Sequence, residues 1–230
     1  MSLKPDLSVN IADIKLQNPI IPASGTFGFG AEYADFFDLR LLGALVTKGI
    51  TLEPRDGNPQ PRIWETSCGM INSIGLENPG IKRFISEKMP FMRQFGLPII
   101  VNISGFSADE FSQLAKALDK VEGVSGLEVN ISCPNVEHGG MAFGVDPTMA
   151  SKITIAVKNS THLPVIVKLT PNVTDIADIA LFVERSGADA LSLINTVQGA
   201  FISNGKIKII YAIARVWSIR REGTRRSAKR

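Results

Sequence analysis

The sequence predicts an α/β fold of the TIM (β/α)8 barrel type, preceded by an N-terminal β-hairpin and incomplete, with about six of its eight βα units. Short apolar runs alternate with helix-like stretches along the chain. Each of the six runs ends in a compact polar or ionisable residue. In an open doubly wound sheet, only strands near the switch point need such residues, whereas all strand ends of a barrel face one shared site. These polar ends favour the barrel over the open sheet.

The predicted elements follow one another in the order of a repeated βα pattern. A hairpin is expected from Leu7–Val9 and Ile14–Leu16. Helices are expected over Asp109–Val121 and over Asp175–Ser186, the latter followed by Gly187 as a helix stop. The six expected buried parallel strands are Pro19–Ala23, Gly43–Thr47, Pro98–Val101, Gly126–Val129, Pro164–Val167 and Ala190–Ile194. The polar residues that follow them are Ser24, Lys48, Asn102, Asn130 with Ser132 and Cys133, Lys168, and Asn195 with Thr196.

The length of the chain conflicts with a full barrel. Eight βα units take about 250 residues, and the six predicted strands are used up by Asn195 of this 230-residue chain. We therefore expect a sheet with two open edges, a known aggregation liability. Two stretches of about fifteen residues without periodicity, Thr66–Gly80 and Cys133–Pro147, are expected to be binding loops on the active rim.

Composition excludes several classes of protein. Apolar residues make up 44% of the chain, but no run approaches the roughly 20 residues that span a bilayer. The N-terminus lacks the apolar core of a signal peptide, and the only two cysteines, Cys68 and Cys133, have no disulfide or zinc spacing. We expect a cytoplasmic protein without a metal site. The net charge of +3 hides an asymmetry, because residues 201–230 hold nine basic residues and one acidic residue.

Three features of the sequence bear on its chemistry. The glycines of Gly25–Gly30 are spaced G-x-x-G-x-G, which does not match a dinucleotide-binding loop. Lys48 and Lys168 follow apolar strands, and two lysines on one rim favour a shared anionic ligand such as a phosphate, a carboxylate or a reduced flavin over two solvated lysines. Cys133 starts a loop beside these lysines, where a thiol pKa can fall into working range, although a small buried hydrophobe is the commoner role of a lone cysteine.

The motifs resemble those of the class 1B dihydroorotate dehydrogenase catalytic subunit over about residues 3–200. The stretches that carry the resemblance are NPIIPASGTFGFGAEYADF, TKGIT, GNPQPRIWET, GMINSIGLENPG, NISCPNV, GGMAFG, VKLTPNV and LINT. Cysteine within NISCPNV is similar to class 1 enzymes, whereas class 2 enzymes have serine there and a membrane-associating N-terminal segment. The resemblance implies a TIM barrel that binds FMN and oxidises dihydroorotate to orotate in pyrimidine synthesis.

The resemblance also implies roles for individual residues. Cys133 would be the catalytic base at C5 of dihydroorotate, and Lys48 would touch both substrate and flavin. Lys168 would stabilise negative charge on the reduced flavin. The substrate would be bound by Asn72, Ser73, Ile74, Gly75, Leu76, Asn130, Asn195 and Thr196. The FMN contacts would come from Ser24, Gly49, Asn102, Asn130, Lys168 and Ile194.

Partners follow from the same resemblance. Electrons would pass through an iron–sulfur flavoprotein subunit, with FAD and a 2Fe–2S cluster, to NAD, and the catalytic subunit would form a homodimer. No nucleic acid or membrane partner is expected. The alternatives are a class 1A enzyme that uses fumarate, a dihydropyrimidine dehydrogenase-like FMN enzyme, and a non-catalytic fragment.

The resemblance weakens near Ala200. We interpret residues 1–200 as the incomplete FMN-binding barrel and residues 201–230 as an unrelated basic tail produced by a shifted reading frame. A different interpretation of the tail is a basic amphipathic helix, because five large apolar residues fall on one helical stripe. These residues are Ile209, Ile210, Ile213, Val216 and Trp217.

Overall fold

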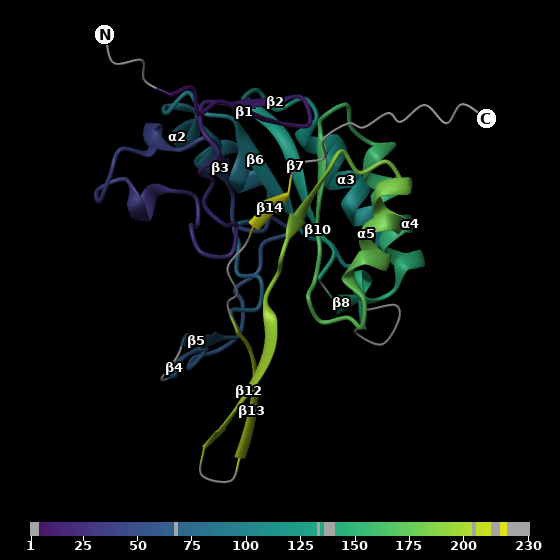
Figure 1. Ribbon diagram of the computed structural model, residues 1–230. Helices are drawn as coiled ribbons and strands as arrows, with labels where there is room; N and C mark the ends of the chain where they lie inside the picture. Colours follow the sequence, from purple (N-terminus) through teal and green to yellow (C-terminus); the bar gives the residue numbers. More distant parts are fainter. Residues whose placement is uncertain are drawn as a thin grey trace, which may run out of the picture.

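The computed structural model describes residues 5–66, 69–132, 134–135, 141–203, 206–212 and 217–219 (Figure 1). Its main sheet has the strand order β14-β11-β10-β7-β6-β3. Every neighbouring pair from β3 to β11 is parallel, and β14 joins the edge strand β11 antiparallel. These strands are β3 (Leu45–Val46), β6 (Ile99–Ile103), β7 (Val124–Asn130), β10 (Val165–Lys168), β11 (Ala190–Leu193) and β14 (Trp217–Ile219). The described part of the main sheet is thus a curled parallel sheet of the kind that forms part of a TIM barrel.

Helices cover the outer face of this sheet, with α3, α4 and α5 side by side on the right of Figure 1. The N-caps Ser107, Asp146 and Asp175 each accept a hydrogen bond from a backbone N–H of the first turn that follows. The long helices are α3 (Ala108–Leu118), α4 (Pro147–Lys158) and α5 (Ile176–Arg185). The shorter helical segments are η1 (Ala31–Tyr33), η2 (Leu39–Leu41), α1 (Gly80–Arg83), the π-turn η3 (Phe84–Lys88), α2 (Met89–Arg93) and η5 (Phe143–Val145).

Two apolar cores lie on the two faces of the curled sheet, because successive residues of a strand point to opposite sides. Val101, Val129 and Val167 point outward and pack with buried helix residues such as Phe111 and Ile153. Ile100, Ile166 and Ala190 point inward and form a second cluster with Ala44 and Val46 of β3 and with Ile14 and Leu16. The inner face therefore has its own apolar layer, which separates the site described below from one end of the sheet.

The N-terminal hairpin closes that end. It consists of β1 (Val9–Ile11) and β2 (Ile14–Leu16), paired antiparallel. At Gly126 of β7, an added Cβ would lie 2.8 Å from Cδ1 of Ile14, so a larger residue here would push the Ile14 side chain of the hairpin aside. The predicted hairpin is confirmed, with its first strand two residues later than expected.

A second, antiparallel sheet extends away from the opposite end of the molecule (Figure 1). Its order is β12-β13-β5-β4, from strands β4 (Ile63–Thr66), β5 (Gly69–Asn72), β12 (Val197–Ser203) and β13 (Lys206–Ala212). A small ladder, β8 (Pro134–Asn135) with β9 (Met141–Ala142), follows β7. The stretches Thr66–Gly80 and Cys133–Pro147 thus contain short strands and η5 as well as loop, and their role as binding loops stays a prediction.

Two further sequence predictions fail. Pro19–Ala23 forms no strand, because Pro19 and Pro22 have no N–H to donate to a ladder. It still lies beside β3, where the Gly43 N–H donates to the Ile20 carbonyl at 2.7 Å. The helical interpretation of the tail fails for its described residues, since Lys206–Ala212 is a strand and β14 covers the edge of β11 that was expected to be open. Of the stripe residues, Ile213 and Val216 lie outside the described residues.

Asp119, at the end of α3, ties this helix to the loop before β10. Its carboxylate accepts hydrogen bonds from Thr161 Oγ1 and the His162 backbone N–H, each at 2.6 Å, and lies 3.1 Å from His162 Nδ1. The Thr161 hydrogen bond first, then those from His162, lower the pKa of Asp119 from 3.8 to about 2.

This lowered pKa predicts how stability depends on pH. Because the folded state has the lower pKa, Asp119 contributes stability above its unfolded pKa of 3.8, and this contribution is lost as the pH falls toward 2. Asp119→Asn is expected to flatten the dependence of the unfolding free energy on pH between 4 and 2, measured by urea denaturation. The exposed Asp178→Asn in α5 is the control. An unchanged slope in Asp119→Asn contradicts the prediction.

Candidate active site at the carboxyl ends of the parallel strands

On the inner face of the sheet, the side chains change from apolar to polar two residues further along the strands than the apolar layer. Four strands each contribute one inward polar side chain at this level, and a fifth comes from the segment after Pro19–Ala23. All five are between 2% and 6% exposed. We call them the polar layer: Ser24, Asn102, Glu128, Lys168 and Ser192. Alternation along the strands places these residues above Ile100, Ile166 and Ala190.

Lys168 and Glu128 form a buried ion pair within the polar layer. Lys168 Nζ donates to Ser24 Oγ at 2.8 Å and lies 3.8 Å from Glu128 Oε1. Asn102 Nδ2 donates to the same Oε1 at 2.6 Å. Burial raises the pKa of Glu128, but the charge of Lys168 and hydrogen bonds from Ser24, Asn102 and Ser192 outweigh it and hold that pKa below its usual value. The carboxylate form of Glu128 is therefore favoured beside Lys168.

The loop after β3 lies directly against Asn102. A Cβ added at Gly49 would be 3.0 Å from Asn102 Oδ1, 3.2 Å from Ser104 Oγ and 3.7 Å from Leu76 Cδ2. Leu76 and Asn102 thus both lie beside Gly49. The Ser104 hydroxyl is buried and has no hydrogen-bond partner among the described residues. Lys48 is half-buried, and within the described residues its side chain forms no ion pair.

A second group of polar side chains lies where β7 and β11 end. Asn195 Nδ2 donates to Asn130 Oδ1 at 2.8 Å, and the Ser132 N–H donates to the same oxygen at 3.2 Å. The Thr196 N–H donates to Asn195 Oδ1 at 2.8 Å. We call Asn130, Asn195 and Thr196 the amide cluster. Its side chains orient one another, and Ser132 beside it has a buried hydroxyl without a partner among the described residues.

The segment from Asn72 to Leu76 is fixed by Asn58. Asn58 Nδ2 donates to the backbone carbonyl and the hydroxyl of Ser73, both at 2.9 Å, and the Asn58 N–H donates to the Ile74 carbonyl at 2.9 Å. Gly75 has a φ of +78°, and an added Cβ would lie 2.7 Å from Asn58. Glycine is thus required at this turn.

The structure brings many of the predicted residues together. Ser24, Asn102 and Lys168 meet in the polar layer, Gly49 lies beside Asn102 and Leu76, and Asn130, Asn195 and Thr196 form the amide cluster. Ile194 is half-buried directly before Asn195. Cys133, the predicted catalytic base, lies outside the described residues. No interaction in the described part of the chain joins Lys48 or Asn72 to the two groups through a side chain.

Sequence reasoning missed Glu128 and Ser192. The signal for Glu128 was present, because an acidic residue stands in the middle of the otherwise apolar run Gly126–Val129. A carboxylate at such a position is almost never buried unless paired. Its register neighbour on β6 is Asn102, and Lys168 lies at the end of the next strand.

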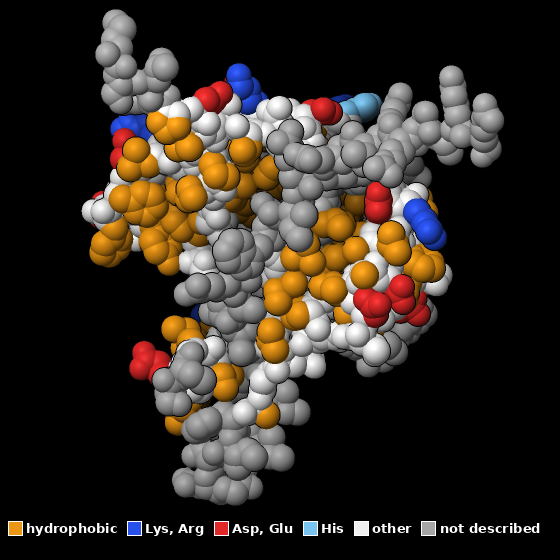
Figure 2. All heavy atoms as spheres, viewed as in Figure 1, with side chains coloured by type: hydrophobic (Ala, Val, Ile, Leu, Met, Phe, Trp, Pro, Cys, Tyr) orange, Lys and Arg blue, Asp and Glu red, His pale blue; other side chains and the backbone are white. Residues whose placement is uncertain are grey.

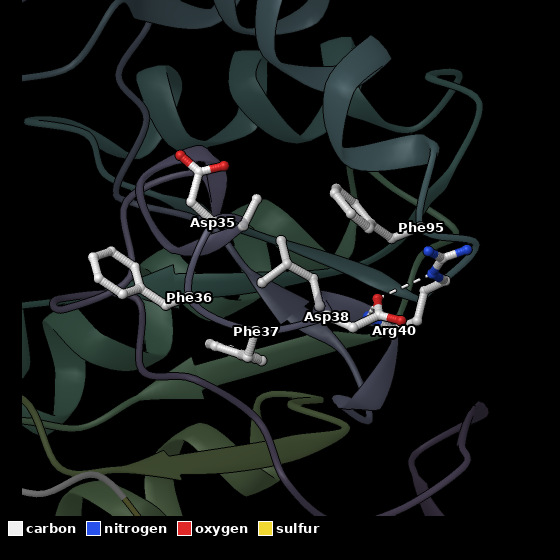
Figure 3. Close-up of a pocket in the computed structure, with 8 residues that line it drawn as sticks. Asp35, Phe36, Phe37, Asp38, Arg40 and Phe95 are labelled. Atoms are coloured by element: carbon white, nitrogen blue, oxygen red, sulfur yellow. Dashed lines mark hydrogen bonds and ion pairs between the residues drawn. The ribbon is translucent and has the colours of Figure 1, made fainter.

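Other features of the described chain lie away from this site. A surface hollow is lined by residues 34–40 and Phe95, with Asp38 and Arg40 joined by an ion pair at 3.0 Å (Figure 3). Its surroundings are apolar, since Phe36 is 83% and Leu41 68% exposed, and hydrophobic side chains gather on the side where α2 lies (Figure 2). None of the predicted site residues lines the hollow. Within the described residues, no cluster of three His, Cys, Asp or Glu could hold a metal. No helix there is long and apolar enough to cross a bilayer.

A curled parallel sheet with polar groups at its carboxyl ends defines a protein of the TIM-barrel enzyme class. A family model described as dihydroorotate dehydrogenase matches residues 6–213. The chain belongs to the dihydroorotate dehydrogenase family. The family's TIM barrel confirms the predicted fold class. The division of the chain at residue 200 stays a prediction.

Curated relatives are catalytic subunits of the NAD(+)-linked B type. The chain is similar to "Dihydroorotate dehydrogenase B (NAD(+)), catalytic subunit" of Geotalea uraniireducens (strain Rf4), with 54% identity over 209 residues, 91% of this chain and 68% of the relative. The proteins of the same name from Thermoanaerobacter pseudethanolicus and Desulforamulus reducens are 54% and 55% identical, covering 86% and 90% of this chain and 65% and 68% of the relatives. The chain thus spans about two thirds of these relatives, and the sequence-based resemblance to class 1B is confirmed.

Proposed function

We propose that this chain is the catalytic subunit of a class 1B dihydroorotate dehydrogenase, which oxidises dihydroorotate to orotate in pyrimidine synthesis with FMN as cofactor. The observation that carries the proposal is the buried Lys168 beside Ser24, Asn102 and Gly49 at the carboxyl ends of the strands. Members of this family use a flavin.

The residues present fit a flavin. The Lys168 ammonium has three N–H donors, and within the described residues it donates one hydrogen bond, to Ser24. The amides of Asn102 and Asn130 add donors and acceptors that suit a pyrimidine-like ring edge. The hydroxyls of Ser104 and Ser132, which have no partner in the described part of the chain, add more. The approach to Asn102 is open because residue 49 is glycine. These groups, with Ile194, would hold the flavin ring.

In the proposed reaction, FMN supplies the acceptor for the hydride that leaves C6 of dihydroorotate. Asn130, Asn195 and Thr196 bind the substrate's amide and carbonyl groups, helped by Lys48 and by Asn72, Ser73, Ile74, Gly75 and Leu76. The amide cluster is oriented before substrate binds, because Asn195 and Asn130 already share a hydrogen bond of 2.8 Å. Cys133 removes the proton from C5, and Lys168 provides positive charge where the reduced cofactor carries negative charge.

The proposal includes partners. The relatives are named as catalytic subunits of an NAD(+) enzyme, which implies a separate electron-transfer subunit for them. We propose that electrons from this chain pass to an iron–sulfur flavoprotein subunit, with FAD and a 2Fe–2S cluster, and then to NAD, and that two catalytic subunits pair. These names favour NAD over the fumarate of class 1A enzymes as the final acceptor. A cytoplasmic location stays a prediction.

A visible absorption spectrum tests the proposal. The purified 230-residue chain is mixed with FMN, freed of unbound flavin and then treated with dihydroorotate without oxygen. We expect stoichiometric bound flavin whose absorbance bleaches with dihydroorotate and not with dihydrouracil. Bleaching by dihydrouracil instead would support a dihydropyrimidine dehydrogenase-like enzyme. A colourless protein would support a non-catalytic fragment.

A further inference from the structure

Glu128 is a buried charge to which neither the sequence analysis nor the proposed reaction assigns a role. It is 5% exposed, at the centre of the polar layer, and faces the interior of the curled sheet. Two residues earlier along the strands, the same face is filled by Ile100, Ile166 and Ala190. An apolar side chain would therefore suit this face, and a buried ion pair is often no more stabilising than apolar residues of similar volume. Stability alone is thus a weak reason for a carboxylate here.

The hydrogen bonds around Glu128 fix its carboxylate without using Lys168. Asn102 Nδ2 donates to Oε1 at 2.6 Å, and the nearby hydroxyls of Ser24 and Ser192 help to lower the pKa of this carboxyl. Lys168 Nζ, at 3.8 Å, is too far for a hydrogen bond but close enough for strong attraction. Glu128 is therefore a fixed counter-charge that leaves the N–H donors of Lys168 available to other groups.

Asn102 and Ser24 connect the two charged side chains. The Ser24 hydroxyl oxygen accepts hydrogen bonds from Lys168 Nζ at 2.8 Å and from Asn102 Nδ2 at 3.4 Å. The same Asn102 Nδ2 donates to the Glu128 carboxylate at 2.6 Å. This chain of contacts, together with the attraction between the two charges, holds the Lys168 ammonium at this place.

We propose that Glu128 is a positioning residue that acts through Lys168: it keeps the Lys168 ammonium charged and oriented toward the flavin, and so favours the reduced cofactor. The inference rests on the proposed function, because it assumes that flavin binds beside Lys168. It adds to that function a residue that touches neither substrate nor cofactor. Without Glu128, the ammonium would be buried without a counter-charge, which disfavours its charged form.

The midpoint potential of bound FMN tests this inference in four forms of the full chain: wild type, Glu128→Gln, Lys168→Met and the double variant. Glutamine keeps the shape and hydrogen bonding of Glu128 but removes its charge. We expect both single variants to shift the potential to more negative values by at least about 30 mV, a tenfold change in the two-electron equilibrium. In the Lys168→Met background, Glu128→Gln should cause no further negative shift, because Glu128 favours the reduced cofactor only through the lysine.

Apoprotein melting and FMN affinity, from flavin fluorescence, are measured on the same variants. Glu122→Gln is the matched control, since the Glu122 side chain is 82% exposed and pairs with Arg93 at the surface. A lower melting temperature in Glu128→Gln with an unchanged potential and FMN affinity would show a structural role only and overturn the inference. Additive shifts in the double variant would overturn it as well.

The design separates this inference from the function on which it rests. If Glu128→Gln does not fold, the comparison of the double variant, whose polar layer is again neutral, with Lys168→Met decides the question. An equal or more positive potential in the double variant supports the inference, and a more negative one overturns it. A wild-type chain that takes up no FMN contradicts the proposed function itself.

Discussion

Cys133→Ala is expected to slow the reduction of bound flavin by dihydroorotate by about 10²- to 10⁴-fold, the usual contribution of a positioned general base. The described neighbours of Cys133 support this role. The chain leaves β7 at Asn130, whose Oδ1 accepts from the Ser132 N–H at 3.2 Å and from Asn195 Nδ2 at 2.8 Å. The backbone at Ser132, the last described residue before Cys133, is therefore held by the amide cluster. FMN binding should be unchanged, since the predicted flavin contacts remain.

Stopped-flow absorbance without oxygen measures this effect directly, because it observes the step in which the substrate loses its proton and its hydride. Cys133→Ser should be intermediate, as a hydroxyl can take the same place but is a weaker acid than a thiol. Cys68→Ala is the control, since it removes the only other cysteine of the chain and should leave the rate unchanged. A wild-type rate in Cys133→Ala would mean that another group removes the proton.

The sequence predicted the strands of the parallel sheet because each is a short apolar run that ends in a polar residue. Ile99–Ile103, Val165–Lys168 and Ala190–Leu193 lie within one or two residues of their predicted bounds at each end. Alternation does not show on these strands, since both faces are buried, one by helices and one by the hairpin. The division of the buried residues between the two cores, and the existence of the polar layer, could therefore be recognised only in the structure.

Long-range pairing explains what the sequence could not predict. Strand β13 pairs with β5, with Tyr211 opposite Asn72. No local periodicity in the sequence indicates that these two strands are partners. The hydrogen bond between Lys168 and Ser24 joins residues 144 positions apart. The resemblance assigned both residues to FMN, but Glu128, which lies 3.8 Å from the Lys168 ammonium, was visible in the sequence only as an acid within an apolar run.

Pro19–Ala23 shows how a failed strand prediction can still lead to a correct site residue. The segment has no ladder, yet it is held along β3 by the hydrogen bond from the Gly43 N–H to the Ile20 carbonyl. Asn18 is anchored as well, through its Nδ2 to the Leu41 carbonyl at 2.9 Å. The chain is thereby directed so that Ser24 reaches Lys168 in the polar layer.

Gly43→Ala is accordingly expected to destabilise the fold by about 3 kcal/mol or more, at the upper end of overpacking effects. An added Cβ would stand 2.0 Å from the Asn18 carbonyl oxygen and 3.2 Å from that of Ile20, and both are backbone atoms that cannot rotate away. Urea denaturation measures the loss. Gly25→Ala is the matched control, within about 0.5 kcal/mol of wild type, because nothing lies within 4 Å of its added Cβ. Since the segment that Gly43 holds carries Ser24, any Gly43→Ala protein that still folds should also bind FMN more weakly. Wild-type stability together with wild-type FMN affinity would show that this close approach does not place Ser24.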